Sequence, residues 1–323
     1  MSLFSVVGDV HLSVKPPGQR TETYQQDILD KLQFIVDKSL EFKVDGIIFN
    51  GDLLHVKTPS RTSFELVQAT HEILKAVPCY FTIGNHDIQN NRLDSLPQQP
   101  LGALTRMNNM HLMNGPVGGL PVYSIPYMVE DDAAKNLPKV FRKIETWRKK
   151  NKYDSVIISS HLTIFPVGQK PPYDYIAADD YANLLVTKGF TYLLANGHIH
   201  DIQGESYPLD GYKHIKYVNY GSVSRGSLTS ENLKKQPVFY TYDTVTEDLQ
   251  VFDIPVKPAE QVFKLDSAGA VKERKASMTN FLDSLQSDAV EVTSVSQVVD
   301  SARSSGVESS VVNQVEQLLE WVE

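Results

Sequence analysis

The sequence predicts an α/β fold in which β-sheets form a sandwich flanked by helices. The first observation is that short apolar segments alternate with segments of helical periodicity in the first third of the chain, which predicts βαβ units on a common sheet. The second is that later apolar segments continue the strand pattern without intervening helices. The predicted strands are 4–7, 46–50, 79–83, 155–160, 192–196, 213–220 and 237–244, and the predicted helices are 21–42 and 63–76.

Each predicted element has a local reason. In the segment 21–42, apolar residues such as Ile28 and Leu32 recur on one helical face. Thr23 with Gln26 has the spacing of a capping box at the start of this helix. The predicted strands are short and rich in β-branched or aromatic residues, which favour a pleated, buried surface.

The composition changes after about residue 256. Residues 266–323 hold only two aromatic residues, Phe281 and Trp321, and many serines, which predicts a small α+β or helical appendage with flexible joints. The predicted domains are 1–255, 256–305 and a terminal helix 306–323. This helix places apolar residues along one narrow seam, which suits packing on its own domain and docking on a partner about equally. The seam residues are Val311, Val315, Leu318 and Val322.

Composition and charge indicate a globular protein with an uneven charge distribution. Of the 323 residues, 41% are apolar and 22% are charged, which is too mixed for a disordered or membrane protein. The formal charge is −8, but residues 266–323 carry ten acids and four bases, so only −2 remains for residues 1–265. The main domain can therefore present a positive groove.

Cysteine content and hydropathy bear on location. The single Cys79 cannot form an internal disulfide, which predicts a reducing compartment. No apolar run approaches the roughly 20 residues that span a bilayer. The opening segment lacks a basic leader and soon reaches Asp9 and His11, so it is predicted to be a strand and not a signal peptide. We expect no membrane association.

Histidines are scarce, nine in all, yet most follow directly after a predicted strand. The strand ends read GDVH (8–11), NGDLLH (50–55), GNHD (84–87), SSH (159–161) and GHIH (197–200). Because such strand ends converge on one edge of a sheet, side chains far apart in the sequence can meet there. A lone histidine after a strand is usually structural, but five such segments in order predict a metal centre. His71, His111 and His214 fall outside the pattern and are predicted to be structural.

The residue types at these strand ends suit two metal ions. Asp9 and His11 are one residue apart and can face the same ion, and His198 and His200 can divide between two ions. Asp52 ends the central strand and is the predicted bridge. Asn85 would add a neutral oxygen ligand that limits the negative charge of the site. Carboxylate and imidazole ligands suit Mn²⁺, Fe²⁺ or Zn²⁺ better than Ca²⁺.

These motifs, matched in order over roughly residues 3–205, resemble those of the calcineurin-like metallophosphoesterases. The resemblance implies a sandwich of two mixed sheets and the hydrolysis of a phosphate ester by a hydroxide that two metal ions activate. It implies that His86 is no ligand but donates a proton to the leaving oxygen or stabilises the transition state. The implied ligands are Asp9, His11, Asp52 and His200 for one ion, and Asp52, Asn85, His161 and His198 for the other.

His55 narrows the substrate class. Phosphoprotein phosphatases of this superfamily carry GDxxDRG, whereas this chain reads GDLLHVKT and lacks the second acid and the arginine. The histidine, with SVVGDVHL, VPCYFTIGNHD and NYGSVSRGS, resembles the SbcD-type DNA nucleases, in which it helps place the DNA backbone. That resemblance implies two Mn²⁺ ions, with Mg²⁺, Fe²⁺ or Zn²⁺ as alternatives, and exonuclease action on duplex ends, with endonuclease action on single strands as a further possibility. The compact length and acidic tail most resemble the forms that large tailed phages encode.

Cations in the loops after the metal motifs give further support to a DNA substrate. Contacts to phosphates position nucleic acid without reading its sequence. Ordinary solvated loop cations are the alternative for any one of them, and the basic segment 138–152 is predicted to be a solvated helix face. The domain 256–305 would cap the site or contact DNA. The candidate contacts are Lys15, Arg20, Lys57, Arg61, Arg92 and Arg225.

The SbcD resemblance also implies partners. No GxxxxGK[ST] loop occurs, so we expect no nucleotide bound by this chain and no ATP hydrolysis through a P-loop. The resemblance implies an SbcC-type, SMC-like ATPase, and the seam on 306–323 is the candidate surface for gripping its coiled coil. It also implies a homodimer within the complex. The implied location is the cytoplasm, which is that of the bacterial host if a phage encodes the chain.

Two other classes of function stay open. A small-molecule phosphodiesterase would use the same centre on a cyclic nucleotide or a nucleotide diphosphate. A non-catalytic scaffold would have kept the fold and lost the metals, which the intact motifs disfavour. His55, the C-terminal extension and the loop cations favour the nuclease. The segment 161–181, rich in Pro and Tyr, is a contact loop for either substrate or subunit.

Overall fold

The computed structural model describes residues 3–55, 62–166, 168, 169, 171, 174–185, 190–207 and 214–265. The chain divides into two units, of which the first is Met1–Val262 and the second begins at Phe263. The predicted seam residues Val311, Val315, Leu318 and Val322 lie outside the described residues, as do Lys57 and Arg61. The domain boundaries at 255 and 305 therefore stay predictions.

The first unit contains two mixed six-stranded sheets. The first sheet comprises β1 (Leu3–Val7), β2 (Gly46–Phe49), β3 (Cys79–Thr82), β4 (Met110–Met113), β13 (Val238–Asp243) and β14 (Leu249–Asp253), in the order β14-β13-β1-β2-β3-β4. The second comprises β5 (Gly115–Pro116), β6 (Val122–Ile125), β7 (Ser155–Ser160), β10 (Thr191–Asn196), β11 (Gly204–Ser206) and β12 (Ile215–Asn219), in the order β11-β12-β10-β7-β6-β5. A small parallel pair joins β8 (Ile164–Phe165) to β9 (Ile176–Ala177).

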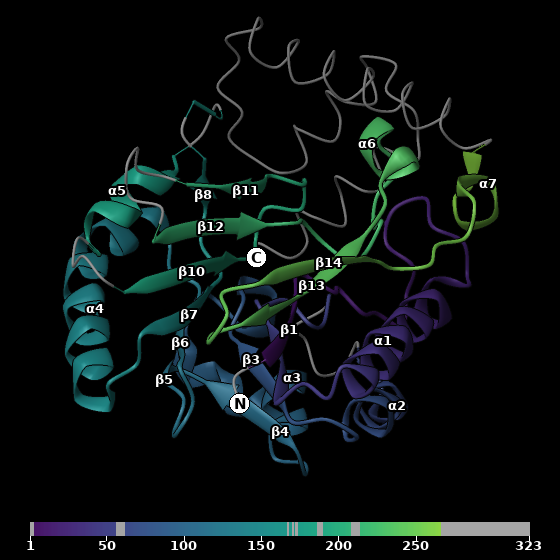
Figure 1. Ribbon diagram of the computed structural model, residues 1–323. Coiled ribbons are helices and arrows are strands. Elements are labelled where there is room, and N and C mark those ends of the chain that lie inside the picture. Colours follow the sequence, from purple (N-terminus) through teal and green to yellow (C-terminus); the bar gives the residue numbers. More distant parts are fainter. Residues whose placement is uncertain are drawn as a thin grey trace, which may run out of the picture. The chain divides into compact units, whose positions relative to one another are not determined.

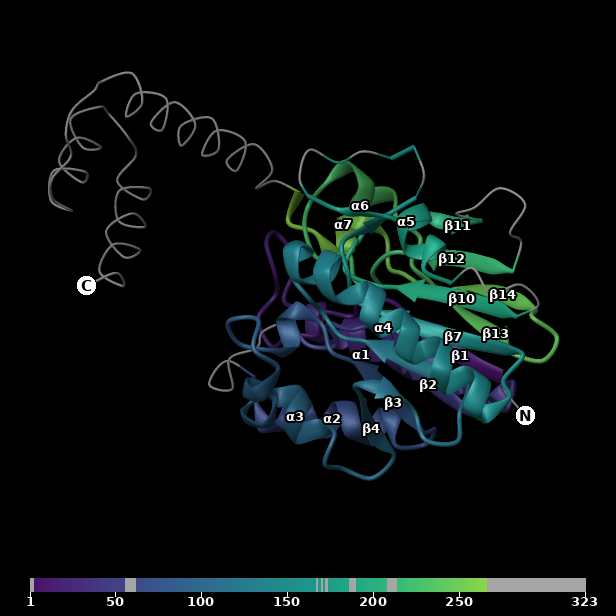
Figure 2. The same ribbon diagram turned by 90° about the vertical axis from the view of Figure 1, so that its left-hand side faces the viewer.

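Helices cover the outer faces of the two sheets, as Figures 1 and 2 show. The longer helices are α1 (Tyr24–Glu41), α2 (Phe64–Leu74) and α4 (Glu130–Asn151), and the short ones are α3 (Pro100–Leu104), α5 (Ala178–Asn183), α6 (Ser230–Lys234) and α7 (Ala259–Val262). One apolar core packs the first sheet against α1, α2 and α3, and a second packs the other sheet against α4. A third core lies between the sheets and includes Val6, Ile157 and Leu193. This layering confirms the predicted sandwich.

The strands and helices predicted within residues 1–255 are confirmed, but the predicted capping box on α1 is wrong, and the predicted helix 306–323 lies outside the described residues. Thr23 is the N-cap of α1, yet its side chain makes no cap hydrogen bond. Its backbone is already helical, and its hydroxyl donates to Asp27 Oδ2 at 2.9 Å. Gln26 donates to Asp30 Oδ1 instead. The start of α1 is thus held by side-chain contacts along the helix.

The parallel strands bring the motif residues to shared edges. Strands β1, β2 and β3 run parallel in the first sheet, and β7 and β10 run parallel in the second. Their carboxyl ends therefore lie in a row within each sheet. The residues that follow these strands are Asp9 and His11 after β1, Asp52 and His55 after β2, Asn85 and His86 after β3, His161 after β7, and His198 and His200 after β10.

Candidate metal centre

Side chains from three of these strand ends form a first group of potential ligands. Nε2 of His200 lies 3.3 Å from Asp9 Oδ2 and 2.8 Å from His11 Nε2. His11 Nε2 is 3.8 Å from Asp52 Oδ2. Atoms that bind one ion at about 2.0 to 2.2 Å lie roughly 3 Å apart, so these separations suit a shared cation.

A second group lies on the other side of Asp52. His161 Nε2 is 3.3 Å from Asp52 Oδ2 and 3.1 Å from Asn85 Oδ1. His198 Nδ1 is also 3.1 Å from Asn85 Oδ1. Asp52 Oδ2 therefore faces both groups, in the place that a bridging carboxylate would occupy. The structure brings all seven predicted ligand residues together.

The backbone at three of these residues is unusual. His11, Asp52 and His198 have φ values of 52°, 48° and 70°, in the left-handed region. This conformation costs on the order of 1–3 kcal/mol for a residue that is not glycine, and such strain concentrates at functional sites. The backbone N–H groups of Val10 and His11 both donate to Asp52 O, at 3.1 and 2.9 Å, which holds the two turns side by side.

The glycines of the motifs make room for the ligands. A Cβ at Gly51, where φ is +103°, would lie 2.2 Å from His161 Nδ1. A Cβ at Gly84 would lie 2.1 Å from Asp52 Oδ1. No side chain fits at either position, which explains why a glycine precedes the acid in NGDLLH and the asparagine in GNHD.

The electrostatics of the cluster favour added positive charge. Asp9 and Asp52 are each 1% exposed. Burial alone would raise the pKa of Asp52, but His161 and His11 more than offset this and hold it well below its usual range. Burial would lower the pKa of His161, yet the two carboxylates raise it to about 10. Without a metal ion, the buried acids thus hold a proton on His161, and a divalent cation would supply that charge instead.

Two other imidazoles of the cluster are neutral. Burial lowers the pKa of His11 to about 3 and that of His198 to about 4. The neutral ring is the form that binds metal ions. Carboxylate, amide and imidazole donors in this arrangement fit Mn²⁺, Fe²⁺ or Zn²⁺.

Hydrogen bonds behind the ligands hold them in place. His161 Nδ1 donates to the carbonyl oxygen of Asn50 at 2.7 Å, which leaves Nε2 for an ion. Asp87 Oδ2 accepts from the backbone N–H of Gly84 at 2.8 Å and of Asp52 at 3.0 Å, so it ties two ligand loops together. Asp87 belongs to the GNHD motif, but no role was predicted for it from the sequence.

Two further residues near the centre were not predicted. Lys235 Nζ donates to the carbonyl oxygen of His200 at 2.6 Å and to Ser222 Oγ at 2.8 Å, so it fixes the loop of a potential ligand. The ring of Tyr127 lies 5.4 Å from that of His198. Neither residue lies in a motif, and no signal in the sequence links them to the centre.

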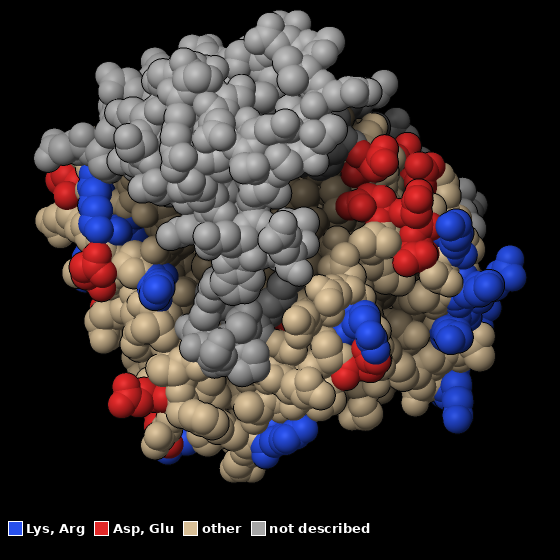
Figure 3. All heavy atoms as spheres, turned by 180° about the vertical axis from the view of Figure 1, so that it is seen from behind, with Lys and Arg blue, Asp and Glu red and all other residues tan. Residues whose placement is uncertain are grey.

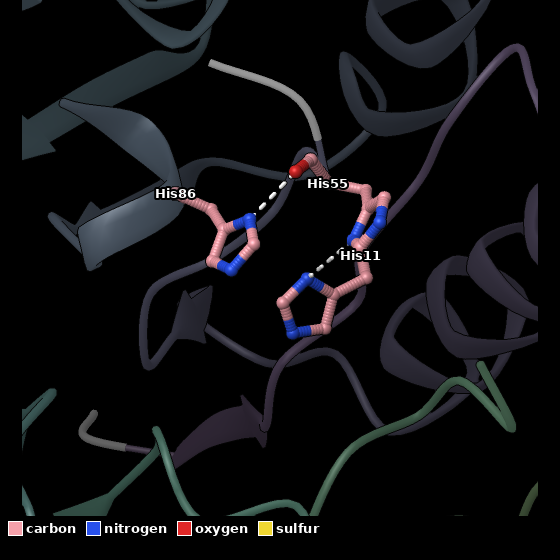
Figure 4. A group of neighbouring side chains, drawn as sticks. All are labelled: His11, His55 and His86. Atoms are coloured by element: carbon pink, nitrogen blue, oxygen red, sulfur yellow. Dashed lines mark hydrogen bonds between the residues drawn. The ribbon is translucent and has the colours of Figure 1, made fainter. Parts of the chain in front are cut away.

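His86 and His55 lie next to His11 of the first group, as Figure 4 shows. His86 Nδ1 donates to the carbonyl oxygen of His55 at 2.6 Å, and its backbone N–H donates to Asp52 Oδ1 at 2.8 Å. His55 Nδ1 is 3.4 Å from His11 Nδ1. Both rings line a cavity of about 180 Å³, whose other lining residues include the small residues Ser222, Ser224, Gly226 and Ser227.

Two of the predicted DNA contacts require correction. Arg20 and Arg225 are only 2% and 4% exposed. Arg20 donates to the carbonyl oxygens of Val262 and Arg225 and pairs with Asp27 at 3.0 Å, while Arg225 donates to the carbonyl oxygen of Lys257. Buried guanidinium groups bound to the protein's own oxygens join segments of the fold and offer no surface contact. The small neighbours of Arg225 line the cavity, but Arg225 does not.

The other described candidates lie on the surface. Lys15 is exposed, and the side chain of Arg92 is 70% exposed and pairs with Asp94 at 2.6 Å. The face seen in Figure 3 carries separate small groups of basic and acidic side chains among uncharged residues. On the described part of that face, no continuous basic surface marks a path for a polyanion.

Comparison with known proteins identifies the family. Residues 3–201 match the sequence model of the calcineurin-like phosphoesterases, and the chain belongs to this family. It is therefore a metal-dependent phosphoesterase, and its His and Asp clusters form the dimetal site typical of such enzymes. Among the described helices, none is both long and apolar enough to cross a bilayer.

A curated relative and two solved structures are similar to the chain. The DNA double-strand break repair protein Mre11 of Methanococcus maripaludis is 25% identical over 255 residues, which cover 72% of this chain and 62% of that protein. The chain thus spans less than two thirds of that relative's length. The protein TT1561 of Thermus thermophilus is 13% identical, with a TM-score of 0.47 over 79% of this chain and 99% of its own. A dimetal phosphatase from Danio rerio is 15% identical, with a TM-score of 0.48 and the same coverages of 79% and 99%.

Proposed function

We propose that this phosphoesterase is the nuclease subunit of a DNA repair and recombination complex of the SbcD type. It would act as an exonuclease on duplex ends and as an endonuclease on single strands. The observation that carries the proposal is His55, a histidine beside His86 where the phosphoprotein phosphatases of the superfamily have an acid. The distant similarity to an Mre11 protein supports the same substrate class.

The two ligand groups support the proposed metal-binding roles. Asp9, His11, Asp52 and His200 would hold one ion, and Asp52, Asn85, His161 and His198 the other. The ions would be Mn²⁺, with Mg²⁺, Fe²⁺ or Zn²⁺ as alternatives. When bound, they would lower the pKa of a water molecule and neutralise charge on the phosphate. The protein supplies the buried acids and the hydrogen bonds that orient the imidazoles.

His86 is the proposed proton donor. Its Nδ1 is committed to the carbonyl oxygen of His55 at 2.6 Å, so its Nε2 remains for the substrate. Its backbone N–H is fixed on Asp52 Oδ1. The ring therefore stands beside the ligand groups without belonging to them, where it can protonate the leaving oxygen.

The cavity beside the histidines is the proposed place for the DNA backbone. Ser222, Ser224 and Gly226 are small and leave room beside the histidines for a sugar-phosphate chain. Lys15 and Arg92 are the described surface cations left as candidate contacts. Lys57 and Arg61 stay candidates outside the described residues.

The proposed partner is an SbcC-type, SMC-like ATPase that the helix 306–323 would bind, in a complex that holds two copies of this chain. The proposed location is the cytoplasm, and the likeness to phage-encoded forms stays a prediction. Deletion of residues 306–323 should abolish co-purification with the ATPase and leave metal-dependent hydrolysis intact. An unchanged complex would refute this docking role.

The test of the nuclease proposal is Mn²⁺-dependent release of nucleotides from end-labelled duplex DNA. The purified chain is assayed beside a chromogenic phosphodiester, with the His86→Ser variant as control. We expect DNA degradation that the variant has lost. Diester hydrolysis without DNA cleavage, even with the ATPase added, would favour a small-molecule phosphodiesterase, to which the small size of the cavity, about 180 Å³, is also suited.

A further inference from the structure

His11, a member of the first ligand group, also forms a cluster with the rings of His55 and His86. His11 follows β1, His55 follows β2, and His86 lies in the 3₁₀ turn Asn85–Asp87 after β3. One nitrogen of each ring lies within 4.8 Å of one nitrogen of each of the others, and Figure 4 shows the three side chains together. No carboxylate belongs to this cluster. It therefore differs in chemistry from the groups that contain Asp9 and Asp52.

The spacing of two of these rings already suits a metal ion. Nδ1 of His11 and Nδ1 of His55 are 3.4 Å apart. Two imidazole nitrogens on one tetrahedral zinc ion, each bound at about 2.0 to 2.1 Å, lie about 3.3 to 3.4 Å apart. The ring centroid of His86 is 4.9 Å from that of His11 and 5.3 Å from that of His55. One nitrogen of His86 lies within 4.8 Å of a nitrogen of each of the other two rings.

Each ring has a nitrogen left for this role. His11 Nε2 faces Asp52 and His200, so its Nδ1 is the nitrogen that points to His55. His86 Nδ1 donates to the carbonyl oxygen of His55, so its Nε2 is available. An ion bound to His11 Nδ1, His55 Nδ1 and His86 Nε2 would leave that backbone hydrogen bond intact.

The donor set determines which metal the cluster prefers. Three imidazole nitrogens suit zinc, copper and nickel, whereas manganese and magnesium prefer oxygen ligands. The two groups around Asp52 mix oxygen and nitrogen donors, so they accept manganese. The cluster of three histidines discriminates against it.

We propose that His11, His55 and His86 form a third metal site, which prefers Zn²⁺ to Mn²⁺, and that an ion bound there inhibits hydrolysis. Binding displaces the one proton that the two Nδ1 atoms of His11 and His55 share and releases it to solvent, and with an ion on its Nε2 as well, His11 would bridge the two ions as an imidazolate. The ion also occupies Nε2 of His86, which would otherwise protonate the leaving group. The inhibition rests on the proposed function, but the third site does not.

The count of bound ions tests the site. The full chain without an affinity tag is dialysed in excess Mn²⁺ against stepwise Zn²⁺, and both metals are measured by mass spectrometry. We expect the wild type to retain one more Zn²⁺ per chain than His55→Asn at the same free concentration. The control His111→Asn, which changes an exposed histidine on β4, should retain the wild-type count. Equal zinc retention in the wild type and His55→Asn would overturn the site.

Two further measurements complete the test. Circular dichroism and a preserved Mn²⁺ content will show that His55→Asn is folded. In the chromogenic diester assay, Zn²⁺ that fills the third site should lower the wild-type rate at least tenfold and leave the residual rate of His55→Asn unchanged. Equal inhibition of both would mean that zinc acts by displacing manganese, which overturns the inhibitory role. If the wild type shows no hydrolysis, the proposed function fails, while the zinc count still decides the third site.

Discussion

Two clusters of charged side chains lie on either side of the segment 222–226, and they differ in the groups with which their charges pair. The basic cluster consists of the buried Arg20, Asp27, Lys31 and Arg225 together with the exposed Lys257, and its cations donate to carbonyl oxygens and to Asp27. The acidic pair Asp9 and Asp52 pairs with imidazoles, and within the described residues it forms no ion pair with a Lys or Arg side chain, although burial lowers the pKa of nearby Lys235 and Asp9 opposes this lowering. The basic cluster is paired with oxygens of the protein and stabilises the fold. The acidic pair is paired with imidazoles and can bind a cation.

The largest expected effect comes from His86, which stands beside the acidic pair and is no ligand of the two ions proposed there. His86→Ser should lower the rate of diester hydrolysis about 10²- to 10⁴-fold, because it removes a proton donor. The Mn²⁺ content, measured on the same sample, should not change. A parallel loss of metal and activity would make His86 part of the metal-holding set and contradict its assigned role.

Mutations in the basic cluster should lower the free energy of unfolding. Arg20→Met removes one partner of a buried ion pair and leaves Asp27 with less compensation, so we expect the free energy of unfolding to fall by about 3–5 kcal/mol. Urea unfolding measures this. Arg92→Met, which removes an exposed cation, is the matched control and should change stability by less than about 1 kcal/mol. If Arg20→Met left the free energy of unfolding unchanged but weakened DNA binding, the original prediction that Arg20 contacts DNA would be supported.

Metal addition should stabilise the protein through the acidic pair. An ion that binds only the folded chain adds about 2.7 kcal/mol at a concentration 100 times its dissociation constant. We therefore expect Mn²⁺ to raise the midpoint of thermal unfolding and EDTA to reverse the rise. Asp9→Asn should shrink the effect. A midpoint of thermal unfolding that does not change with Mn²⁺ would contradict Mn²⁺ binding at Asp9 and Asp52.

The smallest effect is a pH dependence that comes from Lys31. Burial lowers the pKa of Lys31 to about 7, and nearby Arg225, Arg20 and Lys235 contribute to this lowering against the opposing influence of Asp27. The unfolded chain holds this proton up to about pH 10, so the unfolded state binds more protons between pH 7 and 10, and stability rises with pH. The unfolding free energy of the wild type relative to Lys31→Met should rise by at most about 1.4 kcal/mol per pH unit in this window. A flat difference would show that Lys31 keeps its charge.

The strand-end residues could be predicted from the sequence, whereas the buried cations could not. Polar residues at the ends of apolar strands are visible in the sequence, and parallel pairing brings them to one edge, so the convergence of Asp9, Asp52 and His161 followed from topology. Arg20 and Arg225 look like surface cations in the sequence, because burial depends on what the segments around Val223 and Val262 cover. Lys235 and Tyr127 approach the centre from distant segments, and only the folded chain reveals them.

The most direct test of the central claim, that the acidic pair is part of a dinuclear metal centre, is the number of Mn²⁺ ions bound per chain, measured together with diester hydrolysis in the wild type and in Asp52→Asn. We expect two ions in the wild type and, in the variant, the loss of at least one ion together with the activity, because Asp52 Oδ2 faces both ligand groups. An Asp52→Asn variant that retains both ions, or a wild type that hydrolyses the diester with no bound metal, would contradict the account.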